Sequence, residues 1–397
     1  MIPRPTYIEK LLLFKDKDLI KVLTGFRRVG KSTLLELYTQ HLLEHGVTKD
    51  QIISINFEDP RNESIGSSQK LYEHILARVK KGVKNYIFLD EIQQVEAFEK
   101  AIDGFYLNKN LDIYITGSNA YFLSGELATL LSGRYVEIPV YSFSFKEYAS
   151  AHKGIANLTL LQDYMKFGGL PYTLAMEKNP QSIFDYLGGV YNTVVRKDIL
   201  TRLRTNNVLA LDAVTKFLFD NVGNATSIKR ISDTLTSSGT KITSPTVAHY
   251  VEALMDAYVL QKSSRYDLKG KRYLQTQEKY YLTDLGLRYY LLGDRPGDLG
   301  RLLENVVYVE LKRRNHDVAI GKSYSSEIDF VATGSLGVSY YQVAASVLDE
   351  QTLNRELTPL RAISDNHPKF LLTLDEIGIG SHQGIEQRNV IEWLLQD

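Results

Sequence analysis

The chain has 397 residues, of which 44% are hydrophobic and 24% charged, with 47 basic and 47 acidic side chains. This balance is typical of a globular protein of two or three domains, and the zero net charge excludes a chain whose whole surface attracts nucleic acid or membrane. The absence of cysteine excludes disulfides and thiol catalysis. The first residues lack the apolar core of a signal peptide and no run of about 18 apolar residues occurs, so we expect a cytoplasmic protein without a membrane helix.

The first motif is a glycine loop between a predicted buried strand, residues 19–24, and a predicted helix, residues 32–45. Its glycines allow backbone N–H groups to turn toward one phosphate, and the helix amino terminus adds positive potential. Lys31 would contact the β- and γ-phosphates, and the Ser32 hydroxyl would bind Mg²⁺. The sequence therefore predicts a nucleotide-binding loop of the form G-x-x-x-x-G-K-S, formed by Gly25, Phe26, Arg27, Arg28, Val29, Gly30, Lys31 and Ser32, with Thr33 next in the helix.

The second motif is acidic and follows the glycine loop about 60 residues later, after a predicted strand at 51–56 and a predicted helix at 71–81. An apolar strand at 85–89 ends in Asp90 and Glu91, which is the Walker B form that a nucleotide-binding loop requires. Asp90 would hold Mg²⁺, directly or through water, and Glu91 would orient and deprotonate the attacking water.

The next predicted strand, residues 111–116, is followed by polar residues. Ser118 or Asn119 would lie beside the γ-phosphate and position the water, or would cap a helix predicted over 120–131; the two roles are compatible. Arg134 precedes another predicted strand at 135–140. It would stabilise charge on a nucleotide bound to a neighbouring subunit, or it is a surface residue that completes a helix end.

Together these motifs resemble the AAA+ ATPases. More narrowly, the chain is similar to a bacterial and archaeal family in which an AAA-type domain precedes a winged helix and a restriction-endonuclease-like domain, and Arg4-Pro5-Thr6-Tyr7 is similar to that family's start. The resemblance implies ATP and Mg²⁺ as ligands and a five-stranded parallel sheet with the P-loop strand central. It also implies that Arg134 is an arginine finger acting within a homo-oligomer. The choice of ATP over GTP rests on this resemblance.

A helical lid is predicted over 146–205, with one helix over 183–203. Within the lid, the sequence Gly168-Gly169-Leu170-Pro171 is similar to the G-x-P motif of signalling AAA-related NTPases, whose proline packs on the adenine. By that resemblance Pro171 contacts the base of the nucleotide. The alternative is a simple helix break at glycine and proline.

A winged helix is predicted over 206–292, from three helices followed by two strands around a basic segment. From Arg196 to Lys279 there are fourteen Lys and Arg against eight Asp and Glu, a local excess of six positive charges. Thr246, His249 and Tyr250 lie on the predicted recognition helix. This pattern suits double-stranded DNA through its phosphates, with a protein partner as the open alternative.

The last domain, 293–397, resembles the restriction-endonuclease-like fold, whose site combines an Asp on one strand with Glu/Asp-x-Lys on the next. Asp329 and the helix acid Glu304 match that pattern, but Gln342 replaces the second acid and Ala344 replaces the lysine. A neutral amide is a poor Mg²⁺ ligand, and an alanine side chain can neither donate nor accept a proton. We therefore expect a nuclease fold without nuclease activity. Nothing supports Lys322 as a relocated lysine.

The sequence thus predicts an α/β protein with an AAA-type ATP-binding domain at 1–145, then lid, winged helix and nuclease-like domain. We expect it to hydrolyse ATP with Mg²⁺ and so drive a conformational switch that acts on or with DNA. Two alternatives remain: an ATP-dependent nuclease using Asp329 and Glu304, and a slow-turnover nucleotide-binding signalling module.

Overall fold

The structure is a computed structural model that describes residues 2–118, 131, 133–153, 156–176, 179–268, 270, 272–295, 297–323 and 326–396. Asn119 and nearly all of the helix predicted over 120–131 lie outside these ranges. The chain divides into two compact units. Unit 1 comprises Met1–Tyr141 and Asp256–Tyr258, and unit 2 comprises Ser142–Met255 and Val259–Asp397.

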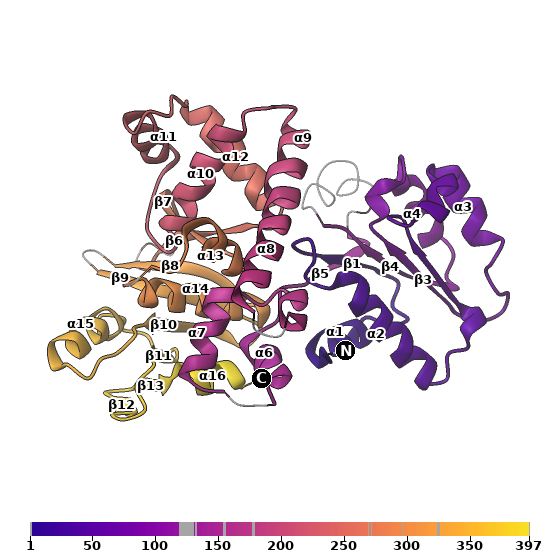
Figure 1. Ribbon diagram of the computed structural model, residues 1–397. Helices are drawn as coiled ribbons and strands as arrows, with labels where there is room; N and C mark the ends of the chain where they lie inside the picture. The colour runs from indigo at the N-terminus through magenta and orange to yellow at the C-terminus, as the bar shows by residue number, and fades with distance from the viewer. Residues whose placement is uncertain are drawn as a thin grey trace. The chain divides into compact units, whose positions relative to one another are not determined.

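Unit 1 is built on a five-stranded parallel sheet with the strand order β2-β3-β4-β1-β5. Helices α1 and α2 lie on one face of the sheet, and α3 and α4 lie on the other (Figure 1). This confirms the predicted AAA-type sheet, although the P-loop strand β1 lies between β4 and β5 and the middle place belongs to β4. The elements of unit 1 are α1 (Pro5–Leu13), β1 (Ile20–Thr24), α2 (Lys31–Glu44), β2 (Ile52–Asn56), α3 (Ser68–Leu76), β3 (Asn85–Asp90), α4 (Phe98–Tyr106), β4 (Leu111–Thr116) and β5 (Tyr135–Pro139).

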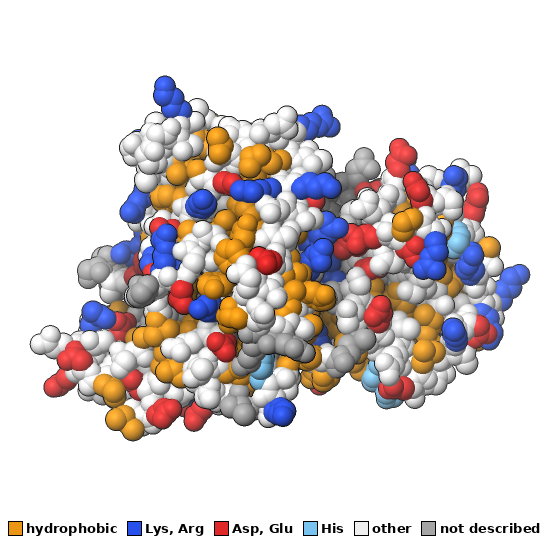
Figure 2. Space-filling view, viewed as in Figure 1, with side chains coloured by type: hydrophobic (Ala, Val, Ile, Leu, Met, Phe, Trp, Pro, Cys, Tyr) orange, Lys and Arg blue, Asp and Glu red, His pale blue; other side chains and the backbone are white. Residues whose placement is uncertain are grey.

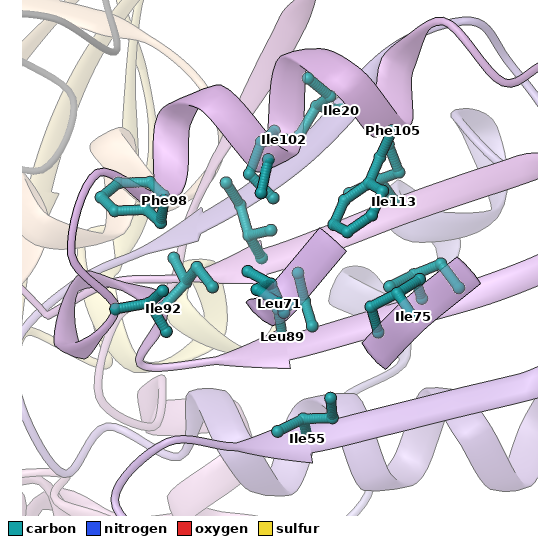
Figure 3. Packing of buried hydrophobic residues seen from close by; sticks show 14 of the residues in the cluster. Ile20, Ile55, Leu71, Ile75, Leu89, Ile92, Phe98, Ile102, Phe105 and Ile113 are labelled. Carbon is teal, nitrogen blue, oxygen red and sulfur yellow. The ribbon is translucent and has the colours of Figure 1, made fainter. Parts of the chain in front are cut away.

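The core of unit 1 follows from the alternation of side chains along each strand. Isoleucines at alternate positions, such as Ile113 and Ile115 of β4, belong to one buried cluster with Ile102 and Phe105 of α4 (Figure 3). The opposite face carries aromatic side chains that pack against α2, because the intervening strand residues point there. The Tyr114 ring lies 5.3 Å from the Tyr38 ring and 4.9 Å from the Phe88 ring.

One ion pair is buried between strands of this sheet. Lys21 of β1 contacts Asp112 of β4, and neither side chain is exposed to solvent. Asp112 also accepts hydrogen bonds from the Tyr114 hydroxyl at 2.9 Å and from the Asp16 N–H at 2.9 Å, while Lys21 donates to the carbonyl of Lys17 at 3.1 Å. Both charges are therefore compensated inside the sheet.

The first half of unit 2 is helical. Its elements are α6 (Phe145–Ala151), α7 (Leu158–Phe167), α8 (Pro180–Val190), a π-helical segment (Tyr191–Asp198), α9 (Ile199–Leu203), α10 (Val208–Asp220), α11 (Ile228–Ser237) and α12 (Ser244–Asp256). The single helix predicted over 183–203 is therefore three segments, because the backbone changes its hydrogen-bond pattern at Tyr191–Asp198.

The second half of unit 2 forms an eight-stranded sheet with the order β12-β13-β11-β10-β9-β8-β6-β7. Strands β8, β9 and β10 are antiparallel neighbours, and β11 joins β10 in parallel after α15. The remaining elements are β6 (Leu260–Asp267), β7 (Arg272–Leu282), α13 (Gly286–Leu292), α14 (Leu299–Arg313), β8 (Asp317–Ser323), β9 (Ser326–Gly334), β10 (Gly337–Val343), α15 (Glu350–Arg361), β11 (Lys369–Thr373), β12 (Gly380–His382), β13 (Ile385–Asn389) and α16 (Val390–Leu395).

Strand β6 pairs with β8 in parallel, so the hairpin predicted for the winged helix continues into the nuclease-like sheet. The sheet thus crosses the predicted boundary between 206–292 and 293–397. None of the helices in the described part of the chain combines the length and the apolar character needed to span a bilayer.

The buried pair yields a stability prediction. Lys21→Met leaves the Asp112 carboxylate buried without its cation, and we expect the free energy of unfolding to fall by about 3–5 kcal/mol. Urea unfolding of the full chain, followed by far-ultraviolet circular dichroism, measures this loss. The double variant Lys21→Met with Asp112→Leu removes both charges and should recover most of it; a single variant as stable as wild type would contradict the prediction.

Candidate nucleotide-binding site

The P-loop lies between the carboxyl end of β1 and the start of α2, as predicted. Gly25 has φ 140°, and a Cβ there would lie 2.1 Å from the carbonyl oxygen of Val140. Gly30 has φ 92° and caps α2, which begins at Lys31. Both positions require glycine, since L-residues rarely adopt this backbone and Gly25 has no room for a side chain.

The other P-loop residues divide between the core and the surface. Phe26 and Val29 are buried and anchor the loop in unit 1. Arg27 forms an ion pair with Glu58 at 2.5 Å, whereas Arg28 and Thr33 are exposed. Two apolar side chains therefore anchor the loop in the core of unit 1.

Lys31 is almost fully buried at the floor of the loop. Its ammonium donates to the carbonyls of Gly25 at 2.9 Å and Phe26 at 3.3 Å, and it lies 3.9 Å from Oε1 of Glu91. Burial lowers the pKa of Lys31, and the carboxylates of Glu91 and Asp90 oppose that shift. Both of these hydrogen bonds go to neutral carbonyls of the loop itself.

Asp90 ends β3 and meets the first turn of α2. Its carboxyl accepts hydrogen bonds from the Ser32 hydroxyl and from the Thr116 hydroxyl, the latter at 2.6 Å. Burial raises the pKa of Asp90, and these hydrogen bonds oppose the rise. An open cavity of about 280 Å³ begins at Ser32 and Asp90 and is also lined by Asn56 at the end of β2.

The oxygens of Ser32 and Asp90 are the hard ligands that Mg²⁺ prefers. Within the described ranges, no group of three or more His, Asp and Glu side chains is arranged to hold a metal ion. Two protein oxygens nevertheless fit Mg²⁺, because this ion usually keeps several waters and substrate phosphates as its other ligands.

Glu91 follows directly, with a left-handed backbone of φ 53°. Its N–H donates to the Thr116 hydroxyl oxygen at 2.8 Å. Its carboxylate oxygen Oε2 accepts from Ser118 Oγ at 2.8 Å and from Gln93 Nε2 at 2.5 Å. The structure therefore brings Ser118 to Glu91, while Asn119 lies outside the described residues.

Sequence reasoning assigned no role to Thr116 or Gln93. A signal for Thr116 was present, since it is the last residue of the strand that neighbours β3 and polar residues at such ends meet the site. Gln93 carried no such signal, because its place depends on how the chain turns after Glu91.

Arg134 lies just before β5, at the opposite edge of the sheet from the P-loop, because Tyr135 pairs with Ile20 at the start of β1. Its guanidinium pairs with Asp103 of α4 at 2.5 Å and lies 5.2 Å from the centre of the Tyr106 ring. Within its own unit, Arg134 is thus remote from the loop and held on α4.

Pro171 belongs to unit 2, where it begins a short 3₁₀ helix, Pro171–Ala175. The two glycines before it pack on a buried carboxyl: a Cβ on Gly168 would lie 2.0 Å from Asp284 Oδ1, and the Gly169 N–H donates to Asp284 Oδ2 at 2.8 Å. Burial raises the pKa of Asp284, and the hydrogen bonds from the N–H groups of Gly169 and Gly286 oppose this rise. The glycines thus have a packing reason within unit 2, and the adenine contact of Pro171 stays a prediction.

The nuclease-like residues form a second cluster in unit 2. Gln342 donates to Glu356 at 2.8 Å and accepts from the Asp329 N–H at 3.3 Å, so it holds two elements together through its amide. Burial, with Glu304 nearby, raises the pKa of Asp329 to about 8.

Sequence reasoning missed the lysine of this cluster. It is Lys279 of β7, not Lys322, and its ammonium lies 3.0 Å from Glu304 and 3.1 Å from Glu327. No local pattern could indicate Lys279, since β7 is separate in sequence from α14 and β9, and the three elements come together only in the folded chain.

Comparison with known proteins identifies relatives along the whole chain. Residues 17–149 match the family described as an AAA domain, and residues 158–298 match a family described as a domain of unknown function. An uncharacterised protein of Haemophilus influenzae is 39% identical over 403 aligned residues, covering 100% of this chain and 99% of that protein. One of Methanocaldococcus jannaschii is 31% identical over 335 residues, covering 79% of this chain and 72% of the relative.

Among solved structures, the Walker-type ATPase PABY2304 of Pyrococcus abyssi is similar in fold. It is 14% identical, covers 73% of this chain and 96% of its own, and superposes with a TM-score of 0.51. The matched domain and this fold support nucleotide binding and ATPase activity. With its P-loop, its parallel sheet in the order 2-3-4-1-5 and its full-length bacterial relative, the chain belongs to the AAA+ family of P-loop ATPases.

Proposed function

We propose that this protein hydrolyses ATP with Mg²⁺ and uses the reaction as a conformational switch that acts with double-stranded DNA. The observation that carries the proposal is the position of Glu91. One of its carboxylate oxygens is held by Ser118 and Gln93, and the other lies 3.9 Å from the P-loop lysine. A carboxylate fixed beside a phosphate-binding lysine is placed to take a proton from water that attacks the γ-phosphate.

The position of each residue gives it a different role in the proposed reaction. Lys31 would exchange its two carbonyl partners for the β- and γ-phosphate oxygens, since charge-assisted hydrogen bonds are the stronger ones. Ser32 and Asp90 would hold Mg²⁺, which neutralises charge on the phosphates when bound. Glu91 would orient the water in line with the bond to be broken and accept its proton.

A pair of variants tests hydrolysis. Lys31→Ala removes the phosphate contact and should weaken ATP binding at least tenfold, while Glu91→Gln keeps the shape of the site and should retain binding but lower phosphate release about 100-fold or more. Phosphate release and binding of a fluorescent ATP analogue measure the two effects. The exposed Glu96→Gln, five residues from Glu91, is the matched control. Unchanged turnover in either site variant would refute the proposal.

The switch is supported by a contact of the amino-terminal motif within unit 1. The buried guanidinium of Arg4 donates to the carbonyl of Val29 in the P-loop at 3.2 Å and to that of Tyr141 at 2.9 Å. Tyr141 is the last residue of the first segment of unit 1. A shift of the P-loop on nucleotide binding would thus be transmitted to the point where the chain leaves for unit 2.

An oligomer in which Arg134 contacts the nucleotide of a neighbouring copy is part of the proposal and rests on the resemblance. Its place agrees with such a role in trans, because Arg134 lies beside the amino end of β1, whereas the P-loop follows the carboxyl end of the same strand. The pairing with Asp103 on α4 would have to open for this contact to form.

The DNA partner is proposed from the helices α9 to α12. Figure 2 shows Lys and Arg side chains gathered over this part of unit 2. Exposed members include Lys229 and Arg230 of α11 and Lys241 before α12. On α12, His249 is exposed and Thr246 half-buried, but Tyr250 is buried and so cannot contact bases.

Replacing Lys229, Arg230 and Lys241 by Ala should weaken duplex DNA binding. A plot of the logarithm of the binding constant against the logarithm of the salt concentration gives a straight line. If all three side chains contact phosphates, the steepness of this line falls by about 0.9 for each side chain that is replaced. Fluorescence anisotropy with a labelled duplex at several salt concentrations measures this slope. Replacing Lys49, Lys81 and Lys100, three exposed lysines of unit 1, is the control; equal losses in both variants, or no binding by wild type, would favour a protein partner.

The cluster around Asp329 does not favour nuclease activity. Lys279 already forms ion pairs with Glu304 and Glu327, and a protonated Asp329 is a poor metal ligand. We propose that this cluster is structural.

A pH prediction follows from the raised pKa of Asp329. Between its ordinary pKa of 3.8 and about 8, the unfolded chain has lost the proton while the folded chain keeps it, so this residue lowers stability as pH rises. Asp329→Asn, whose amide oxygen still accepts the Val343 N–H, should therefore be more stable than wild type at pH 7, with a gap that widens by at most about 1.4 kcal/mol for each pH unit in that window.

Urea unfolding from pH 5 to 8, followed through the fluorescence of Trp393 in unit 2, measures the gap. A gap that narrows with rising pH would contradict the structural assignment. Metal-dependent DNA cleavage that Asp329→Asn abolishes would restore the nuclease alternative.

A further inference from the structure

Gln93 lies in a short rigid turn directly after the Walker B strand. The turn is a 3₁₀ helix, Ile92–Gln94, closed by hydrogen bonds from the Gln94 N–H to the Glu91 carbonyl at 3.1 Å and from the Val95 N–H to the Ile92 carbonyl at 2.9 Å. The Ile92 side chain is fully buried in the core of unit 1. The distance between the side chains of Gln93 and Glu91 is thus set by a backbone that the core holds in place.

The Gln93 amide contacts Glu91 through its nitrogen. Its Nε2 donates to Oε2 of Glu91 at 2.5 Å, and Ser118 donates to the same oxygen at 2.8 Å. The amide must face the carboxylate with its nitrogen, because two oxygen acceptors would repel each other. This arrangement satisfies Oε2 of Glu91 and leaves Oε1 facing Lys31 at 3.9 Å.

The same arrangement leaves the other end of the Gln93 amide without a donor. Gln93 Oε1 is buried and has no hydrogen-bond partner among the described residues. A buried acceptor without a partner costs about 1–3 kcal/mol, a cost that the hydrogen bond from Gln93 Nε2 to the Glu91 carboxylate has to offset.

We propose that Gln93 is a positioning residue that holds Glu91 Oε2, so that Oε1 is directed toward the phosphate-binding lysine and the attacking water; this inference rests on the proposed hydrolysis. In that step one O–H of the water donates to Glu91 Oε1. That proton passes to Glu91, the water oxygen forms the new bond to the γ-phosphorus, and the bond from that phosphorus to the bridging oxygen breaks. The bonding pair stays on ADP, and inorganic phosphate is the second product.

The experiment compares Gln93→Leu and Gln93→Met with wild type and with Gln94→Leu, an exposed neighbour in the same turn. We expect kcat for phosphate release to fall about 10- to 100-fold in both Gln93 variants, while the affinity for a fluorescent ATP analogue stays within about twofold. Gln94→Leu should match wild type. A thermal unfolding transition shows which variants are folded. Gln93→Met serves as the second variant if Gln93→Leu prevents folding, because the methionine side chain is flexible.

A second measurement separates positioning from a general structural role. In the Glu91→Gln background, single-turnover hydrolysis should lose no more than about twofold further when Gln93→Leu is added, because Gln93 acts on the step that Glu91 performs. A full additional loss there would overturn the inference. So would wild-type kcat in the Gln93 variants, which leaves the proposed hydrolysis intact; an inactive wild type instead refutes the hydrolysis and the inference with it.

Discussion

The left-handed backbone of Glu91 is the constraint on which the candidate site depends. A glutamate at φ 53° is in a sparsely populated conformation that costs on the order of 1–3 kcal/mol unless the surroundings hold it. Here the Thr116 hydroxyl accepts the Glu91 N–H and donates to Asp90, so one side chain of β4 fixes both acids of β3. The turn directs consecutive side chains to different partners: Asp90 to Ser32, and Glu91 to Lys31 and Ser118.

This arrangement requires a parallel sheet. Strands β1, β3 and β4 all end at the same edge, so the P-loop, the two acids and Thr116–Ser118 meet there although about 90 residues separate the first from the last. Arg4 adds a contact from a fourth segment, since it joins a P-loop carbonyl to the carbonyl of Tyr141. One buried side chain thus joins the P-loop to the end of the first segment of unit 1.

The sequence predicted the parts of this site that are continuous in the chain. The loop from Gly25 to Ser32 and the strand that ends in Asp90 and Glu91 were expected because the hydrophobic pattern and the glycine positions are local signals, and the five-stranded sheet was implied by the resemblance to the AAA+ ATPases. Gln93 and Lys279 were missed for the opposite reason. Their contacts depend on a turn geometry and on the pairing of distant strands, neither of which leaves a local pattern. The π-helical segment Tyr191–Asp198 within the predicted helix 183–203 was also not predicted.

Two buried lysines differ in their partners in a way that supports the roles proposed for their two clusters. Lys31 is satisfied by neutral carbonyls at 2.9 and 3.3 Å, and a triphosphate offers it stronger, charge-assisted partners, so this lysine can exchange. Lys279 is held by two carboxylates at 3.0 and 3.1 Å, and removing it from them would leave buried negative charge. An incoming phosphate or metal ion would have to overcome that cost at Lys279 but not at Lys31. In the proposed function, the same residue type therefore serves a ligand site in unit 1 and a structural ion pair in unit 2, and the identity of its hydrogen-bond acceptors decides which.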